Sequence, residues 1–171
     1  RSGEADTGVV LEKIGHFLDS EHEFLAATMG PGSFRNLEGA ELARAIADEV
    51  DLQRVLQRAS EAFDGGYVLG GLLGNGDCFV MRDPNGIRPA FWVDLPEATA
   101  VASERPALAT VLGVAESEVR ELEPGHALVM KRGRGAAVVP VLEPRTPRKC
   151  TFERIYFSRD RKSTRLNSSH E

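Results

Sequence analysis

The chain has 171 residues, of which 42% are hydrophobic and 27% charged, the profile of one ordinary globular domain. With 26 acidic against 21 basic residues, a net charge of −5 and few aromatic side chains, nucleic acid is not an expected partner. No apolar run approaches the roughly 20 residues that cross a bilayer, and no segment resembles a secretory signal, so we expect no membrane contact and a cytoplasmic location.

The first part of the chain predicts a layer of three helices. Apolar residues recur at helical spacing over residues 9–23, 38–50 and 52–63. Asp6 or Thr7 is available as the N-cap of the first helix.

Short apolar segments between turn residues then predict antiparallel strands. Asn75-Gly76 predicts a hairpin whose two central residues both have positive φ. A short helix is expected over residues 105–112, with Pro106 in its first turn. The expected fold is α+β, an antiparallel meander with helices on one face. Besides the two strands within residues 78–91, strands are expected at residues 67–73, 98–102, 118–122, 127–131, 136–142 and 151–157.

Residues 78–91 predict a strand, a tight turn and a second strand. The turn has the sequence Asp-Pro-Asn-Gly at residues 83–86, in which Pro presets φ and Gly tolerates positive values. By itself this pattern indicates only that two strands are joined.

Four segments in this order resemble the class II glutamine amidotransferase domain, and the last resembles the amidophosphoribosyltransferase family. They lie at residues 78–91, 102–108, 122–127 and 150–158. The resemblance implies a partial four-layer αββα fold of the N-terminal-nucleophile hydrolases. We expect residues 1–158 to be the C-terminal part of such a domain. Residues 159–171 are similar to translated adapter or vector sequence and are expected to be a non-native or disordered tail.

The resemblance also implies an activity for the parent protein. Such enzymes release ammonia from glutamine with an N-terminal Cys and transfer it to phosphoribosylpyrophosphate, giving phosphoribosylamine in the first step of purine synthesis. The nucleophile is expected to be absent here, because Cys78 and Cys150 both fall in strand patterns. We therefore expect a fragment that is inactive by itself and lacks N-terminal strands and a downstream phosphoribosyltransferase domain.

Asp6 is the candidate ligand for the α-amino group of glutamine, since it matches the carboxylate that the family places before its first helix. An Asp at that place is as readily a simple helix N-cap, so both interpretations stay open. The Ser and Glu that flank this position in the family are absent. The expected partners are glutamine, the missing parts of the domain and, for the full-length parent, further copies of itself.

No cofactor is expected in this chain, whereas the resemblance implies magnesium and, in some members, an iron–sulfur cluster in the parent. Cys150 matches one cluster ligand, but a buried thiol is the favoured interpretation. Ser103 and Glu104 are expected to cap the helix that follows them. His16, His22 and His126 have no metal-ligand spacing and are interpreted as ordinary histidines.

Two other functions remain open. Glucosamine-6-phosphate synthase and asparagine synthetase share the turn sequence, although the segment at 152–158 argues against both. A non-catalytic domain on the same scaffold, binding glutamine or a protein, is equally compatible with a missing nucleophile. Residues 143–149 are proline-rich and charged, and are either a connector to a further domain or a surface loop.

Overall fold

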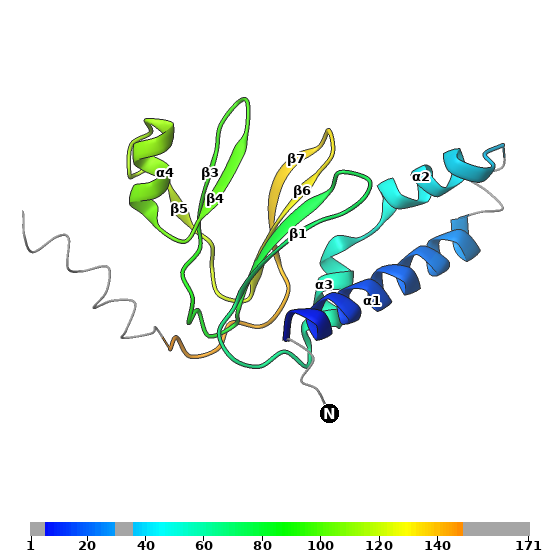
Figure 1. Ribbon diagram of the computed structural model, residues 1–171, viewed down its shortest axis with the longest axis horizontal. Coiled ribbons are helices and arrows are strands. Elements are labelled where there is room, and N and C mark those ends of the chain that lie inside the picture. The colour runs from blue at the N-terminus through cyan, green and yellow to red at the C-terminus, as the bar shows by residue number, and fades with distance from the viewer. Residues whose placement is uncertain (1–5, 30–35, 149–171) are drawn as a thin grey trace, which may run out of the picture.

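The computed structural model describes residues 6–29 and 36–148, which form four helices and seven strands (Figure 1). No helix in this part of the chain is long and apolar enough to cross a membrane. The helices are α1 (Asp6–Met29), α2 (Gly39–Glu49), α3 (Leu52–Ser60) and α4 (Arg105–Leu112). The strands are β1 (Val68–Leu72), β2 (Cys78–Arg82), β3 (Phe91–Asp94), β4 (Thr99–Ala102), β5 (Arg120–Glu121), β6 (His126–Lys131) and β7 (Gly135–Pro140).

The strands divide into two antiparallel sheets rather than the single meander that the sequence predicts. The first has the order β1-β2-β6-β7, and the second has the order β4-β3-β5. The turn at residues 83–86 therefore joins two strands that do not pair, because β2 belongs to the first sheet and β3 to the second. The predicted strand at 151–157 lies outside the described residues.

One face of the four-stranded sheet is covered by α1, α2 and α3. Alternation along β2 sends Phe79 and Met81 to this face, where they pack with buried side chains of the helices. The partners from the helices are Leu25, Ile46, Val50, Leu52, Val55 and Leu56. This is the larger of the two hydrophobic cores and confirms that the first three helices form one layer.

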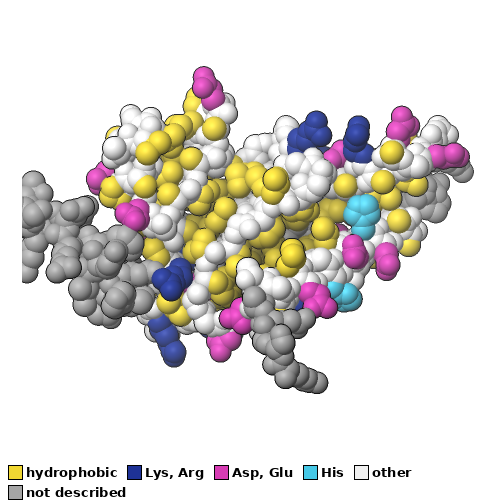
Figure 2. Space-filling model, viewed as in Figure 1, with side chains coloured by type: hydrophobic (Ala, Val, Ile, Leu, Met, Phe, Trp, Pro, Cys, Tyr) yellow, Lys and Arg dark blue, Asp and Glu magenta, His cyan; other side chains and the backbone are white. Residues whose placement is uncertain are grey.

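The opposite face of the same sheet packs on the three-stranded sheet. Val80 and Leu128 point to this side and meet Trp92 and Leu122 in a second core. Figure 2 shows hydrophobic side chains gathered over the region between the two sheets. The four-stranded sheet is thus buried on both faces.

The fourth helix lies on the far side of the second sheet. Because Trp92 faces the first sheet, its neighbour Phe91 faces away, and the Arg105 guanidinium of α4 lies 5.0 Å from the centroid of that ring. The layer order is therefore helices, sheet, sheet, helix. This confirms the α+β class and the αββα arrangement.

The hairpin between β1 and β2 forms as predicted, but not for the predicted reason. Leu72 pairs with Cys78, and Gly76 has a φ of 93°, whereas Asn75 does not have positive φ. The loop is longer than a two-residue turn, and Asn75 instead uses its side-chain amide, which donates to the Ala47 carbonyl oxygen at 3.0 Å. This contact ties the hairpin to the end of α2.

The first helix is longer than the periodic pattern at residues 9–23 indicates. Its second half is held by Glu21, which is 3% exposed and accepts two hydrogen bonds from the Arg54 guanidinium of α3. This hydrogen-bonded partner raises the pKa of Arg54. This polar contact between the helices thus adds to the burial of Leu25 in holding the second half of α1.

Candidate functional site

Asp6, the candidate ligand for the glutamine amine, is the first residue of α1, and its side chain is exposed. A carboxylate in the first turn of a helix interacts favourably with the helix dipole, whatever else it binds. Its proposed contact with an amino group stays a prediction.

The other residues singled out in the sequence are dispersed. Glu104 occupies the N-cap position of α4, but its side chain makes no capping hydrogen bond, so that part of the prediction is wrong. His126 lies with Nδ1 3.0 Å from the Pro124 carbonyl oxygen, in agreement with an ordinary histidine. Cys78 is a free thiol whose Sγ lies 3.9 Å from the Met130 Sδ, and Cys150 lies outside the described residues.

Two consecutive buried charged residues, Arg82 and Asp83, lie at the junction of the two sheets. Arg82 is 2% exposed, and its guanidinium donates to the carbonyl oxygens of Arg88, Gly86 and Leu122. It also pairs with the Glu121 carboxylate at 2.8 Å. One side chain from the first sheet therefore fixes both the following turn and strand β5 of the second sheet.

Asp83 is fully buried and organises the turn at 83–86. Its carboxylate accepts hydrogen bonds from the backbone N–H groups of Asn85, Ile87 and Arg88 at 3.0 to 3.2 Å. Its backbone oxygen accepts from Gly86 and Gly125. The turn that carries the family resemblance thus has a structural role, with the Asp83 carboxylate and carbonyl groups both hydrogen-bonded. The sequence signal for it was two consecutive charged residues at the end of an apolar strand.

A second buried polar cluster lies where the β1–β2 hairpin meets α2. The Lys131 ammonium donates to the carbonyl oxygens of Asp48 and Val50 at 2.7 and 2.9 Å, and lies 3.8 Å from the Asp77 carboxylate. Asp77 is 2% exposed, and its second oxygen accepts from the Arg132 N–H. The sequence pattern did not indicate this cluster, because its members lie on three separate segments.

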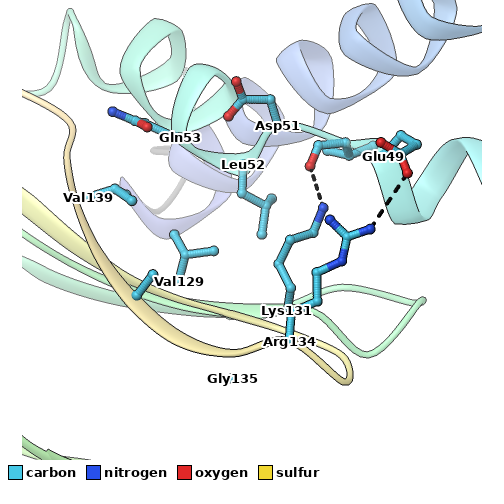
Figure 3. A pocket seen from close by; sticks show the side chains of 11 residues that line it. Glu49, Asp51, Leu52, Gln53, Val129, Lys131, Arg134, Gly135 and Val139 are labelled. Atoms are coloured by element: carbon cyan, nitrogen blue, oxygen red, sulfur yellow. Dashed lines mark hydrogen bonds and ion pairs between the residues drawn. The ribbon is translucent and has the colours of Figure 1, made fainter.

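The cavity beside this cluster, of about 340 Å³, is shown in Figure 3. Lys131 and Arg134 point toward the chain between α2 and α3, and Arg134 lies 3.6 Å from the Glu49 carboxylate. Leu52 and Val129 contribute apolar wall. Both cations of this cavity are thus already paired with groups of the protein.

A larger cleft of about 690 Å³ opens between the two sheets and includes Ser103 in its wall. Tyr67 also lines it, with a hydroxyl oxygen that is buried and has no hydrogen-bond partner. Burial, and then the charge of Asp83, raise the pKa of Tyr67 to about 12, against an opposing effect of Arg145. No cysteine lines this cleft among the described residues.

A metal centre is not assembled by residues 6–29 and 36–148. No three His, Cys, Asp or Glu side chains converge there in a way that would hold a metal ion. The groups present therefore do not fit the magnesium or cluster chemistry that the resemblance implies for the parent.

Comparison with curated proteins identifies relatives that share one name. An amidophosphoribosyltransferase of Methanothermobacter thermautotrophicus is 36% identical over 119 residues, which cover 69% of this chain and 24% of the relative. That of Mycobacterium tuberculosis is 30% identical over 169 residues, covering 93% of this chain and 31% of the relative. The chain thus spans about a quarter to a third of the length of these relatives. No protein-family model matches it.

Comparison with solved structures identifies chains that share this fold. Glutamine phosphoribosylpyrophosphate amidotransferase from B. subtilis, complexed with ADP and GMP, superposes with a TM-score of 0.54 at 24% identity. The match covers 86% of this chain and 31% of that one. An allosteric regulatory enzyme of purine biosynthesis gives the same TM-score over 83% of this chain. The chain is a homologue of one part of the amidophosphoribosyltransferases.

Proposed function

We propose that the chain is part of the glutaminase domain of a cytoplasmic amidophosphoribosyltransferase. That enzyme would release ammonia from glutamine and transfer it to phosphoribosylpyrophosphate, giving phosphoribosylamine, and would act as a homo-oligomer. The observation that carries the proposal is the match with the mycobacterial relative over 93% of the chain. The helix–sheet–sheet–helix order supports it.

We further propose that the chain does not hydrolyse glutamine by itself. The chemistry implied by the resemblance uses a thiol and the free α-amine of the same residue as base. Cys78 is the first residue of β2 and follows Asp77 in the chain, so its nitrogen is an amide, and its thiol contacts Met130 rather than a base. Cys150 is internal to the chain as well. The role left for this segment is to build the scaffold and to bind the glutamine amine through Asp6.

A chimaeric enzyme tests the proposal. The segment of the mycobacterial relative that aligns with residues 6–148 is replaced by residues 6–148 of this chain, and product formation is measured with glutamine and with free ammonia. Activity with both nitrogen sources is the expected result. Activity with ammonia alone would contradict the proposal and favour a non-catalytic binding domain, since the rest of the enzyme would then be shown to be folded.

Asp6→Asn in the chimaera tests the ligand assignment. Loss of a charge-assisted contact with the amino group is expected to raise the KM for glutamine roughly 10- to 100-fold and leave the ammonia reaction unchanged. Asp19→Asn, at an exposed position on the same helix, is the matched control. Equal kinetics for the two variants would reduce Asp6 to a helix-end residue.

A further inference from the structure

The segment at residues 143–148, here called the exit segment, is bonded to the turn at 83–86. The backbone N–H of Arg145 donates to the Pro84 carbonyl oxygen at 2.7 Å, and that of Arg148 donates to the Asn85 carbonyl oxygen at 2.9 Å. The Asn85 side-chain amide donates to the Thr146 carbonyl oxygen at 3.2 Å. Three hydrogen bonds thus join two segments that are far apart in the sequence.

Apolar burial does not hold the exit segment. Val141 is buried and Leu142 partly buried, but every side chain from residue 143 to 148 is exposed. Pro84 and Gly86, in contrast, are buried. The hydrogen bonds to the turn therefore determine where this segment lies.

The turn is a rigid acceptor for these bonds. The Asp83 carboxylate engages the N–H groups of Asn85, Ile87 and Arg88, and Pro84 has no N–H. The outward groups of the turn are therefore the carbonyl oxygens of Pro84 and Asn85, which match the N–H donors of the exit segment. Since Arg82 and Asp83 fix the turn to both sheets, the hydrogen bonds to the turn fix the position of the exit segment relative to both sheets.

We propose that the turn at 83–86 is a seat that sets where, and in which direction, the chain leaves the two-sheet body beyond Arg148. Asn85 is its positioning residue, since its side chain adds the third bond. The consequence for catalysis rests on the proposed function. A seated exit segment would hold the glutaminase domain in register with the part that consumes ammonia, so that ammonia is transferred rather than lost.

Hydrogen exchange on the 171-residue chain tests the seat. In Asn85→Ala, exchange of the Arg145 and Arg148 amides is expected to accelerate roughly five- to tenfold, the factor that corresponds to one hydrogen bond, while amides of β2 and β6 keep their rates. Asn75→Ala is the matched control, because its side chain is bonded to α2 instead. Unchanged rates at Arg145 and Arg148 in Asn85→Ala, or equal acceleration in both variants, would overturn the proposal.

Two further measurements keep the test decisive. Should Asn85→Ala fail to fold, Asn85→Asp retains the shape of the side chain but removes the donor to the Thr146 carbonyl oxygen, and the same local acceleration is expected. In the chimaera, Asn85→Ala is expected to lower the product formed per glutamine hydrolysed at least twofold while hydrolysis continues. An unchanged ratio would remove the coupling role. If the unsubstituted chimaera does not hydrolyse glutamine, the proposed function is refuted. The exchange rates would still decide whether the turn at 83–86 is a seat for the exit segment.

Discussion

Two turns with an Asn-Gly pair flank strand β2, and they send the chain in different directions. The loop that contains Asn75 returns the chain to pair with the strand it has just left, since Leu72 lies opposite Cys78. The turn that contains Asn85 moves the chain from the first sheet to the second. In both, the Asn side chain bonds to a distant segment, namely α2 in the first and the exit segment in the second.

The difference shows that a turn sequence specifies where the chain reverses its direction, but not which strands then pair. The hairpin loop is stabilised mainly by its own strands. The turn at 83–86 has no such ladder. It is fixed by the Asp83 carboxylate, which accepts from three backbone amides, and by Arg82, which donates to the carbonyl oxygens of Arg88 and of Leu122 next to β5. Substitutions that remove the side-chain hydrogen bonds of each turn, but leave the strand pairing intact, should therefore destabilise the two turns to different extents.

The largest difference in the free energy of unfolding is expected between substitutions of the carboxylates of the two turns, Asp83 and Asp77. Asp83→Ala removes the fully buried carboxylate that accepts from three part-buried backbone N–H groups, and is expected to lower the free energy of unfolding by about 3–5 kcal/mol. Asp77→Ala frees one N–H and is expected to cost about 1–3 kcal/mol. Urea unfolding followed by Trp92 fluorescence measures both. Equal losses would mean that the two turns are supported in the same way.

The glycines of the two turns give the next largest contrast. Both have positive φ, 60° at Gly86 and 93° at Gly76, so each Ala variant is strained by its backbone. At Gly86 a Cβ would also lie 2.8 Å from the Pro124 Cγ, whereas at Gly76 its nearest neighbour is the flexible Arg132 side chain at 3.4 Å. We expect losses of about 2–4 kcal/mol for Gly86→Ala and about 1 kcal/mol for Gly76→Ala. Thermal unfolding of both variants would show whether this order is reversed.

Tyr67, whose carbonyl oxygen accepts from the Asp83 N–H, should show a small effect that depends on pH. Because its pKa is raised to about 12 in the folded chain, the neutral phenol stabilises the fold fully below pH 10, and this contribution is lost as the pH rises through 12. After allowance for the part of the ring that water reaches, the loss is about 1–2 kcal/mol. Tyr67→Phe is expected to abolish it.

Absorbance titration at alkaline pH measures the Tyr67 ionisation directly, because the chain contains only two tyrosines. Tyr156→Phe is the control and should retain the transition near pH 12. A single transition near pH 10 in that control would show that the Tyr67 hydroxyl is not buried against the Asp83 side of the cleft. It would also weaken the view that the turn at 83–86 is enclosed.

Local patterns predicted local structure well. The helix at Arg105–Leu112 has the predicted bounds, and α3 begins at the predicted Leu52 because Asp51 caps it through the Arg54 N–H. The β1–β2 hairpin was predicted from Asn75-Gly76, although the reason given for it was wrong. The candidate site was harder to predict from the sequence. Asp6 was proposed only from the resemblance, and Arg82 and Asp83 were recognised only as part of a turn.

The sequence by itself determined the helices, the strands and the α+β class, because helix periodicity, strand alternation and turn residues act over a few neighbouring residues. The family came from the resemblance of four segments and not from these patterns. Tertiary structure alone decided which strands pair within each sheet and that the exit segment rests on the turn at 83–86. Those choices depend on which distant carbonyls and carboxylates can satisfy buried donors. The Arg82 guanidinium reaches Leu122 and Glu121 only once both sheets are assembled, and no local pattern encodes that meeting.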